Sequence, residues 1–140
     1  MRTKCLTYTS LASLDLSDQD LSAILQTARQ MNALNAITGL LIFNGTHFLQ
    51  VIEGPETSIE ELMDRLRQDD RHHHVEVREE YYADERSFPD WTMELVRVQS
   101  SYFEAKSAVT LALPKALPSA ISDRILRMTE QISGTIDLRG

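Results

Sequence analysis

The stretch His47-Phe48-Leu49-Gln50-Val51-Ile52-Glu53-Gly54-Pro55 says most about the fold. Its apolar run from Phe48 to Ile52, bounded by turn residues, is typical of a buried β-strand. Gln50 lies in the middle of that run, and a buried carboxamide left unpaired would cost about 1–3 kcal/mol. It must therefore have a hydrogen-bond partner. That partner is either a neighbouring protein group, which is the commoner case, or a bound polar ligand lying on the sheet.

Two further strands are expected before this one. Ile37–Phe43 is apolar enough for a central strand, and Asn44-Gly45 after it predicts a type I′ hairpin turn into the Gln50 strand. Thr3–Thr9 is the first strand, and alternation places Leu6 and Tyr8 on one of its faces. Tyr8 alone would be read as a core aromatic residue with its hydroxyl group at the rim.

Helix signals follow the first strand and the Gln50 strand. Ser17 is a candidate N-cap, with Asp20 three residues later as a capping-box partner. The helix that follows carries one inward stripe that ends in carboxamides: Leu21, Leu25, Ala28, Asn32 and Asn35. We expect Asn35 to cap this helix. Thr57 and Glu60 predict a second capping box and a helix to about Asp70, which buries Ile59, Leu62, Met63 and Leu66.

The last third of the chain predicts two strands and two helices. Val75–Ala83 and Trp91–Val98 are the strands, and we expect Trp91, Met93 and Leu95 to share a face. Ser101–Leu113 and Pro118–Ile132 are the helices, with Gly134 as the stop. The order β-α-β-β-α-β-β then indicates an α+β, ferredoxin-like sheet with two helices on one face and two more C-terminal helices. The tail, a partner or water must cover the other face.

Composition limits the classes of function. The chain has 140 residues, enough for one domain, and a formal net charge of −7, which argues against nucleic acid or an anionic membrane as the main partner. Its one cysteine cannot form an internal disulfide and favours a reducing compartment. The apolar run Gly39–Phe43 is too short to span a membrane, and no secretory signal is present. We therefore expect a cytoplasmic protein.

Few signals for catalysis or metal binding are present. In Arg71-His72-His73-His74, consecutive side chains point apart, so they do not converge on one metal ion. The sequence contains no glycine-rich phosphate loop and no G-x-S-x-G motif. Nothing therefore points to an enzyme, and we expect no metal site.

Taken together, these residues resemble the BLUF family of flavin-binding blue-light sensors. The resemblance covers residues 3–98 and rests on long, specific segments. They are Tyr8, Asn32-Ala33-Leu34-Asn35-Ala36-Ile37-Thr38-Gly39-Leu40-Leu41, Phe48-Leu49-Gln50-Val51-Ile52-Glu53-Gly54, Arg65, Asp69-Asp70-Arg71-His72-His73 and Phe88-Pro89-Asp90-Trp91-Thr92-Met93. The tail is similar to the helical extension of the short, stand-alone members.

The resemblance implies non-covalent FAD, with its three-ring system between the two helices above the sheet. Two aliphatic stripes would enclose the ring: Leu21, Ile24 and Leu25 from one helix, and Leu62 and Leu66 from the other. Asn32 and Gln50 would bond its polar rim, because a carboxamide both donates and accepts. The ribityl and phosphate end would be held by Arg65, Asp69, His72 and His73. Met31 stands where some relatives carry a second asparagine, so that contact is lost or supplied otherwise.

The family also implies a photoswitch without net chemistry. Tyr8 would donate an electron and then a proton through Gln50, which is left rotated, tautomerised or both, with a small red shift in absorption. A buried polar network of this kind can have two satisfied arrangements, and light changes which is populated. Trp91 and Met93 would be the readout, with one replacing the other near Gln50 before the change reaches the tail helices.

The expected organisation is a sensor core, residues 1–98, with a helical extension, residues 99–140, in the same compact unit. No output domain is expected after residue 98, so the signal would pass to a separate protein or to self-association in a homo-oligomer. A cyclic-di-GMP phosphodiesterase and a response-regulator-like protein are the candidate partners, and the tail stripe Ile121, Ile125, Met128 and Ile132 is the candidate contact. The alternatives are a small-substrate enzyme acting near Arg65 and His72, and a light-independent interaction module.

Overall fold

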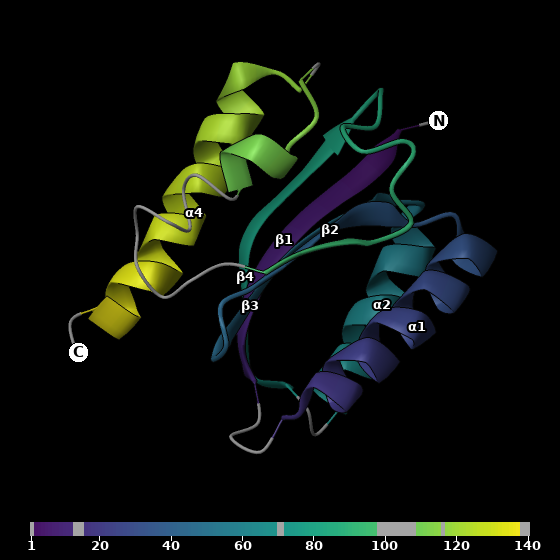
Figure 1. Cartoon of the computed structure of the whole chain (residues 1–140). Helices are drawn as coiled ribbons and strands as arrows, with labels where there is room; N and C mark the ends of the chain where they lie inside the picture. Colours follow the sequence, from purple (N-terminus) through teal and green to yellow (C-terminus); the bar gives the residue numbers. More distant parts are fainter. Residues whose placement is uncertain (1, 13–15, 70–71, 98–108, 116, 138–140) are drawn as a thin grey trace.

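A five-stranded sheet with helices on both faces forms the framework of the protein (Figure 1). The computed structural model describes residues 2–12, 16–69, 72–97, 109–115 and 117–137. The elements are β1 (Thr3–Ala12), α1 (Asp18–Asn35), β2 (Thr38–Phe43), β3 (His47–Gly54), α2 (Glu56–Arg67), β4 (His72–Ala83), β5 (Glu94–Arg97) and α4 (Ser119–Asp137). The strand order is β4-β1-β3-β2-β5, with only β5 and β2 parallel among neighbouring pairs. The expected ferredoxin-like α+β fold is thus confirmed.

Each face of the sheet has its own apolar core. Helices α1 and α2 pack on one face, where the largest fully buried side chains include Tyr8, Phe48, Ile52, Ile59 and Met93. Helix α4 and the segment before it lie across the other face (Figure 1), over Leu40, Ile42, Leu49 and Val51. Of the three covers that the sequence allowed for this face, namely the tail, a partner or water, the structure shows the tail.

That arrangement also corrects the expected role of the tail stripe. Ile125 is buried in the core on that face, and Ile121 and Met128 pack against the same core. The side chain of Ile132 lies outside the described residues. The described members of the stripe face the protein's own sheet and are not an exposed contact surface, because the sheet's second apolar face needs a cover.

The helix ends partly match the sequence signals. Ser17 caps α1 in a complete capping box with Asp20, as predicted. The left-handed residue at the end of α1 is Ala36 (φ 58°), while Asn35 donates its Nδ2–H to the Met31 carbonyl at 2.8 Å. Helix α2 begins directly after Pro55 and ends at Arg67, so the predicted Thr57 capping box and the extension to Asp70 are wrong. Proline presets the backbone angle of a helix start, which moves the start two residues ahead of Thr57.

The β2–β3 hairpin differs from the expected type I′ turn. Only Gly45 has positive φ there, whereas type I′ needs two such residues. Asn44 instead accepts hydrogen bonds through Oδ1 from the backbone N–H groups of Thr46 (3.1 Å) and His47 (2.7 Å). The asparagine thus holds the turn through its side chain.

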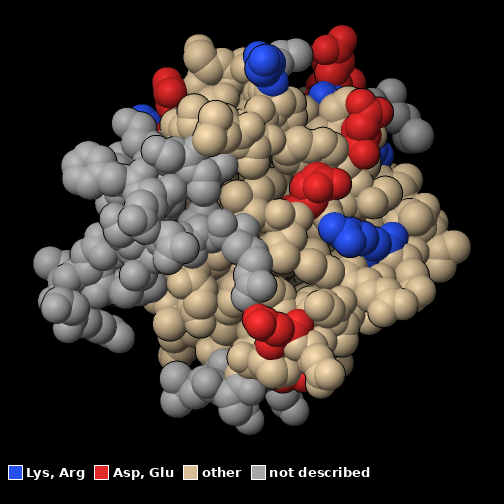
Figure 2. Space-filling view, in the orientation of Figure 1, with Lys and Arg blue, Asp and Glu red and all other residues tan. Residues whose placement is uncertain are grey.

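The C-terminal elements are described in part. Residues 109–112 are helical, and the remainder of the predicted helix Ser101–Leu113 before them lies outside the described residues, as does Val98. Helix α4 continues past Gly134, which is not its stop. No helix within the described ranges is long and apolar enough to cross a membrane. On the described part of the face in Figure 2, acidic and basic side chains are scattered and form no continuous basic patch.

Candidate functional site: a buried phenol–amide pair beneath a cleft

Tyr8 and Gln50 face each other across neighbouring strands. Their Cα atoms are direct partners in the β1–β3 ladder, so both side chains lie on the sheet face covered by α1 and α2. The Tyr8 hydroxyl group donates a hydrogen bond to Gln50 Oε1. Gln50 Nε2 in turn lies 3.1 Å from Met93 Sδ, the acceptor on its other side. The buried amide is thus satisfied by two side chains, both almost fully buried.

Tyr8 keeps its proton in this environment. Burial raises the pKa of Tyr8 well above its ordinary value, and the negative charge of Asp69 raises the pKa further. Both effects disfavour the phenolate. At neutral pH Tyr8 is therefore protonated and can donate, as it does here to the Gln50 oxygen.

A cleft of about 270 Å³ opens above this pair, between α1 and α2. Its volume lies just below the usual range of ligand pockets, about 300–1,000 Å³. Five of the predicted site residues line it: Tyr8, Ile24, Gln50, Arg65 and Asp69. Leu62 and Leu66 line it from α2, as expected, while Leu21 and Leu25 are buried in the core beneath.

The cleft has an apolar wall and a charged end. Ile24 and Leu62 come from different helices and give it apolar side chains on both sides. Arg65 is exposed on α2, and Asp69 is half-buried two residues past the end of that helix. The arrangement suits a flat, largely apolar molecule that carries a polar or charged group at one end.

Asn32 is the buried polar residue with an unused acceptor. It is fully buried, and its Nδ2–H donates to the Thr92 carbonyl oxygen at 2.9 Å. Its Oδ1 atom has no hydrogen-bond partner among the described residues. Asn32 is not in the cleft lining but directly follows Met31, which is. A buried acceptor without a donor is costly, so this oxygen is where an N–H group of a ligand would be stabilising.

Two predicted site residues lie elsewhere. His73 is exposed on β4 opposite Leu11 and does not line the cleft. The side chain of His72 lies outside the described residues. His73 therefore does not line the cleft, and the contacts of both histidines with a cofactor stay predictions.

Trp91 and Met93 do not share a face of the sheet. Met93 is fully buried in the core under α1 and α2, whereas Trp91 packs against the opposite core and stacks on Phe88 at 5.4 Å between ring centroids. Strand β5 begins only at Glu94, so the alternation of a strand does not apply to residues 91–93. Met93, not Trp91, contacts Gln50 in this structure.

One lining residue of α1, Thr27, was missed from the sequence, whereas Ala28 was placed on the inward stripe and Met31 at a position of the family's site. Thr27, Ala28 and Met31 line the cleft beside Ile24. Their spacing from Ile24 is three, four and seven residues, which is one helical stripe. That signal was present, but the adjacent stripe through Leu21 and Leu25 is more apolar and was read as the inward face.

The fold is an α+β domain with a cleft between two helices, and comparison with known proteins identifies its class. The family model "BLUF: Sensors of blue-light using FAD" matches residues 4–94. The chain belongs to the BLUF family.

Individual relatives agree with this assignment. The chain is 42% identical over 89 residues, 63% of its length, to the photoactivated adenylate cyclase subunit beta of Euglena gracilis, and spans only a tenth of that protein. It is similar to the dark-state structure of BlrB, a BLUF protein, with a TM-score of 0.72, 28% identity and coverage of 96% of this chain and 97% of that one. It is also similar to BlrP1 of Klebsiella pneumoniae, solved with manganese and cyclic-di-GMP, with a TM-score of 0.75, 31% identity and coverage of 96% and 33%.

Proposed function

We propose that this chain is a blue-light photoreceptor that binds FAD non-covalently in the cleft and signals through the Tyr8–Gln50 hydrogen bond. The observation that carries the proposal is the chain of contacts Tyr8–Gln50–Met93 at the floor of the cleft. The phenol and the thioether satisfy the buried amide in this arrangement. The same three groups also form a polar network that can be satisfied in more than one way.

The residues present fit a flavin. The apolar walls would enclose the ring system, and Gln50 would reach its polar edge from below. The unpaired Oδ1 of Asn32 would accept a hydrogen bond from a ring N–H group. Arg65, exposed at the cleft, would pair with the anionic end of FAD. When bound, the flavin supplies absorption of blue light and an electron acceptor beside Tyr8.

We assign the Tyr8–Gln50–Met93 contacts of this structure to the dark state, and they suggest a path for the proton of Tyr8. Tyr8 already donates to Gln50 Oε1, so that oxygen is the proton's acceptor when Tyr8 loses an electron. Rotation of the amide would then turn Nε2 towards Tyr8 and Oε1 towards Met93. The Met93 sulfur is only an acceptor and cannot donate to an oxygen, so the contact at 3.1 Å would be lost. We propose that rotation of the amide releases Met93 in this way, whereas tautomerisation without rotation would leave Nε2 beside the sulfur.

Release of Met93 would reach the loop before β5, which carries Trp91. Trp91 would respond through that loop and not by sharing the strand face. We propose that the signal passes from there to a separate partner, either a cyclic-di-GMP phosphodiesterase or a response-regulator-like protein, and that the sensor acts in the cytoplasm as a homo-oligomer. The output parts of larger relatives, as in the Euglena cyclase, support coupling of this fold to an effector.

The first test is the absorption spectrum of the purified protein. A yellow protein with bound FAD and a reversible red shift under blue light supports the proposal. A colourless protein that cannot be reconstituted with FAD contradicts it and favours a light-independent interaction module or an enzyme.

The second test is a pair of substitutions in the network. Tyr8→Phe removes the hydroxyl donor and Gln50→Leu removes the amide, so each should abolish the red shift while FAD stays bound. Tyr82→Phe, at an exposed position on β4, and Gln26→Leu, at an exposed position on α1, are the matched controls and should keep the shift. A normal photocycle in Tyr8→Phe or Gln50→Leu would remove that residue from its assigned role.

A further inference from the structure

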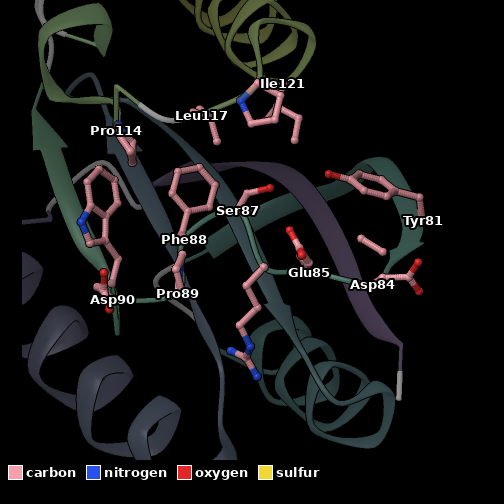
Figure 3. Close-up of a pocket in the computed structure, with 14 residues that line it drawn as sticks. Tyr81, Asp84, Glu85, Ser87, Phe88, Pro89, Asp90, Pro114, Leu117 and Ile121 are labelled. Carbon is pink, nitrogen blue, oxygen red and sulfur yellow. The ribbon is translucent and has the colours of Figure 1, made fainter.

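A second, larger cavity lies on the sheet face opposite the cleft. Its volume is about 720 Å³. It is lined by the end of β4, by the loop 84–91, and by four residues before and at the start of α4: Pro114, Leu117, Pro118 and Ile121 (Figure 3). The family assignment and the proposed photoswitch do not use it. We call it the Phe88 cavity, after its most deeply buried lining residue.

The walls of the Phe88 cavity are apolar and rigid. Phe88 is 1% exposed and stacks on Trp91, and Leu117 and Ile121 line the side formed by the tail. Pro89, Pro114 and Pro118 also line the cavity. Prolines have fixed φ angles and no N–H group, so this wall is preorganised and loses little entropy when a ligand binds.

The rim of the cavity is acidic. Asp84, Glu85 and Asp90 are exposed lining residues, and none forms an ion pair with another described residue. In Figure 3 the carboxylate of Glu85 points towards the middle of the cavity, on the same side as the Ser87 hydroxyl group. Among the described lining residues Arg86 alone is cationic, and it is engaged elsewhere, because it donates to the Ala36 carbonyl at 2.6 Å and to Thr38 Oγ1 at 2.9 Å.

This combination selects one kind of occupant. Apolar walls would take up aliphatic side chains and the stem of an arginine or lysine, whose charged head would reach the acidic rim. An anionic ligand such as a nucleotide would meet repulsion from three carboxylates. We propose that the Phe88 cavity is the docking site of a partner polypeptide segment in which a basic residue is flanked by apolar ones.

The cavity is tied directly to the strands of the photoswitch. Glu53, three residues after Gln50 on β3, is 1% exposed and accepts hydrogen bonds from the backbone N–H groups of Ser87 (2.8 Å) and Phe88. The Trp91 carbonyl accepts from Gly39 N–H on β2 at 2.7 Å. Trp91 is therefore both a wall of the cavity and two residues from Met93. The inferred light dependence of docking rests on the proposed function, whereas the docking itself does not.

The chain offers a direct reporter for a test. Trp91 is its single tryptophan, so one indole N–H signal in the NMR spectrum of the FAD-loaded, nitrogen-15-labelled chain reports on the cavity. The probes are two capped peptides, Leu-Arg-Leu-Arg-Leu and Leu-Glu-Leu-Glu-Leu. We expect the basic peptide to shift this signal saturably and the acidic peptide to leave it in place. No shift, or equal shifts with both peptides, would overturn the proposal.

Matched variants separate the rim from the overall charge. Asp84→Asn with Glu85→Gln should weaken binding of the basic peptide about tenfold, the effect of losing two charge pairs. Glu61→Gln with Asp64→Asn removes the same charge from exposed positions on α2 and should leave the affinity unchanged. Equal weakening in both variants would mean that only net charge attracts the peptide, which contradicts a built site.

Light distinguishes the two proposals in the same sample. The red shift is recorded first, and the titration is repeated under blue light. We expect different peptide affinities in darkness and light. A red shift with equal affinities would overturn the coupling but leave the photoreceptor intact. Peptide binding without a red shift would instead reject the photoreceptor and keep the docking site.

Discussion

At the scale of single residues, the position of Met93 decides the arrangement of the switch. Two consecutive carbonyl groups are held by the same helix: Asn32 Nδ2 donates to Thr92 O at 2.9 Å, and Arg29 Nε donates to Met93 O at 3.0 Å. These bonds fix the backbone that places the Met93 sulfur against Gln50. Helix α1 therefore both lines the cleft and stabilises the contact between Met93 and Gln50, which we propose to be that of the dark state.

We predict that Arg29→Ala prolongs the lit state. Loss of one hydrogen bond, worth about 1 kcal/mol, would destabilise the dark arrangement and slow recovery about fivefold, with FAD still bound. The decay of the red shift in darkness measures this. Arg29→Lys, which keeps a donor, should restore part of the rate, and Gln30→Ala at the next, exposed position should have no effect.

A second measurement guards against an indirect effect on the flavin. The methyl NMR signal of Met93 should move in flavin-free Arg29→Ala and stay in place in flavin-free Gln30→Ala. If the Met93 signal and the recovery rate are both unchanged in Arg29→Ala, the Met93 position does not depend on Arg29.

Residue patterns predicted part of this site. The pattern predicted that the buried Gln50 amide needs a partner, whereas its pairing with Tyr8 was implied only by the family resemblance. The Arg29 contact could not be predicted, because an exposed arginine on a helix is usually solvated. Trp91 was misplaced because its alternation with Met93 was read as that of a strand, whereas those residues precede β5. The roles of Asn32, Arg65 and the histidines came from family resemblance and stay predictions.

At the scale of elements, β3 carries functional groups on both faces. Gln50 points to the cleft, while Glu53 is the acceptor for the loop that bounds the Phe88 cavity. A buried carboxylate needs such donors, because an unpaired charge inside a protein is expensive. One strand thus connects the two sides of the sheet.

We predict that Glu53→Gln lowers the free energy of unfolding by about 2 kcal/mol. The amide is neutral and presents one oxygen where the carboxylate presents two, so the bonds to Ser87 and Phe88 lose their charge assistance. Urea unfolding followed by circular dichroism measures the loss. Glu61→Gln, at an exposed position on α2, is the control, and equal unfolding midpoints for the two variants would show that the Glu53 contacts contribute little.

Element order was predictable, but element ends were less so. The period of apolar residues predicted the central strands and both sheet-covering helices, because burial of one face imposes that period. The start of α2 and the β2–β3 turn depend on local backbone geometry around Pro55 and Asn44, which a capping-box pattern or an Asn-Gly pair only approximates.

At the scale of the whole molecule, two protonated groups face each other across β1 and β4: Cys5 is buried and Tyr81 is half-buried. Burial raises the pKa of Cys5 to about 11 and the pKa of Tyr81 to about 12. Their pKa values in an unfolded chain are about 8.5 and 10. At pH values between the unfolded and the folded pKa of each group, the unfolded chain loses a proton that the folded chain keeps. The free energy of unfolding therefore falls as pH rises through that range.

We therefore predict declining stability from about pH 8.5 upwards, with the Cys5 contribution ending near pH 11. Cys5→Ser removes the titrating thiol and should make the decline shallower between those values. Urea unfolding at a series of pH values measures the slope, and Glu61→Gln should leave it unchanged. An identical slope in Cys5→Ser would show that the thiol has the same pKa in the folded and unfolded states.

The outer edge of the sheet has a consequence for handling the protein. Strand β4 is 12 residues long and stands at the end of the strand order, so one side of its backbone pairs with no other described strand. Such an edge is a template for fibril growth. Four charged side chains on β4 oppose such pairing: Glu76, Arg78, Glu79 and Glu80. Concentrated solutions should accordingly resist seeding of amyloid from this edge at neutral pH and lose that protection when acid neutralises the carboxylates.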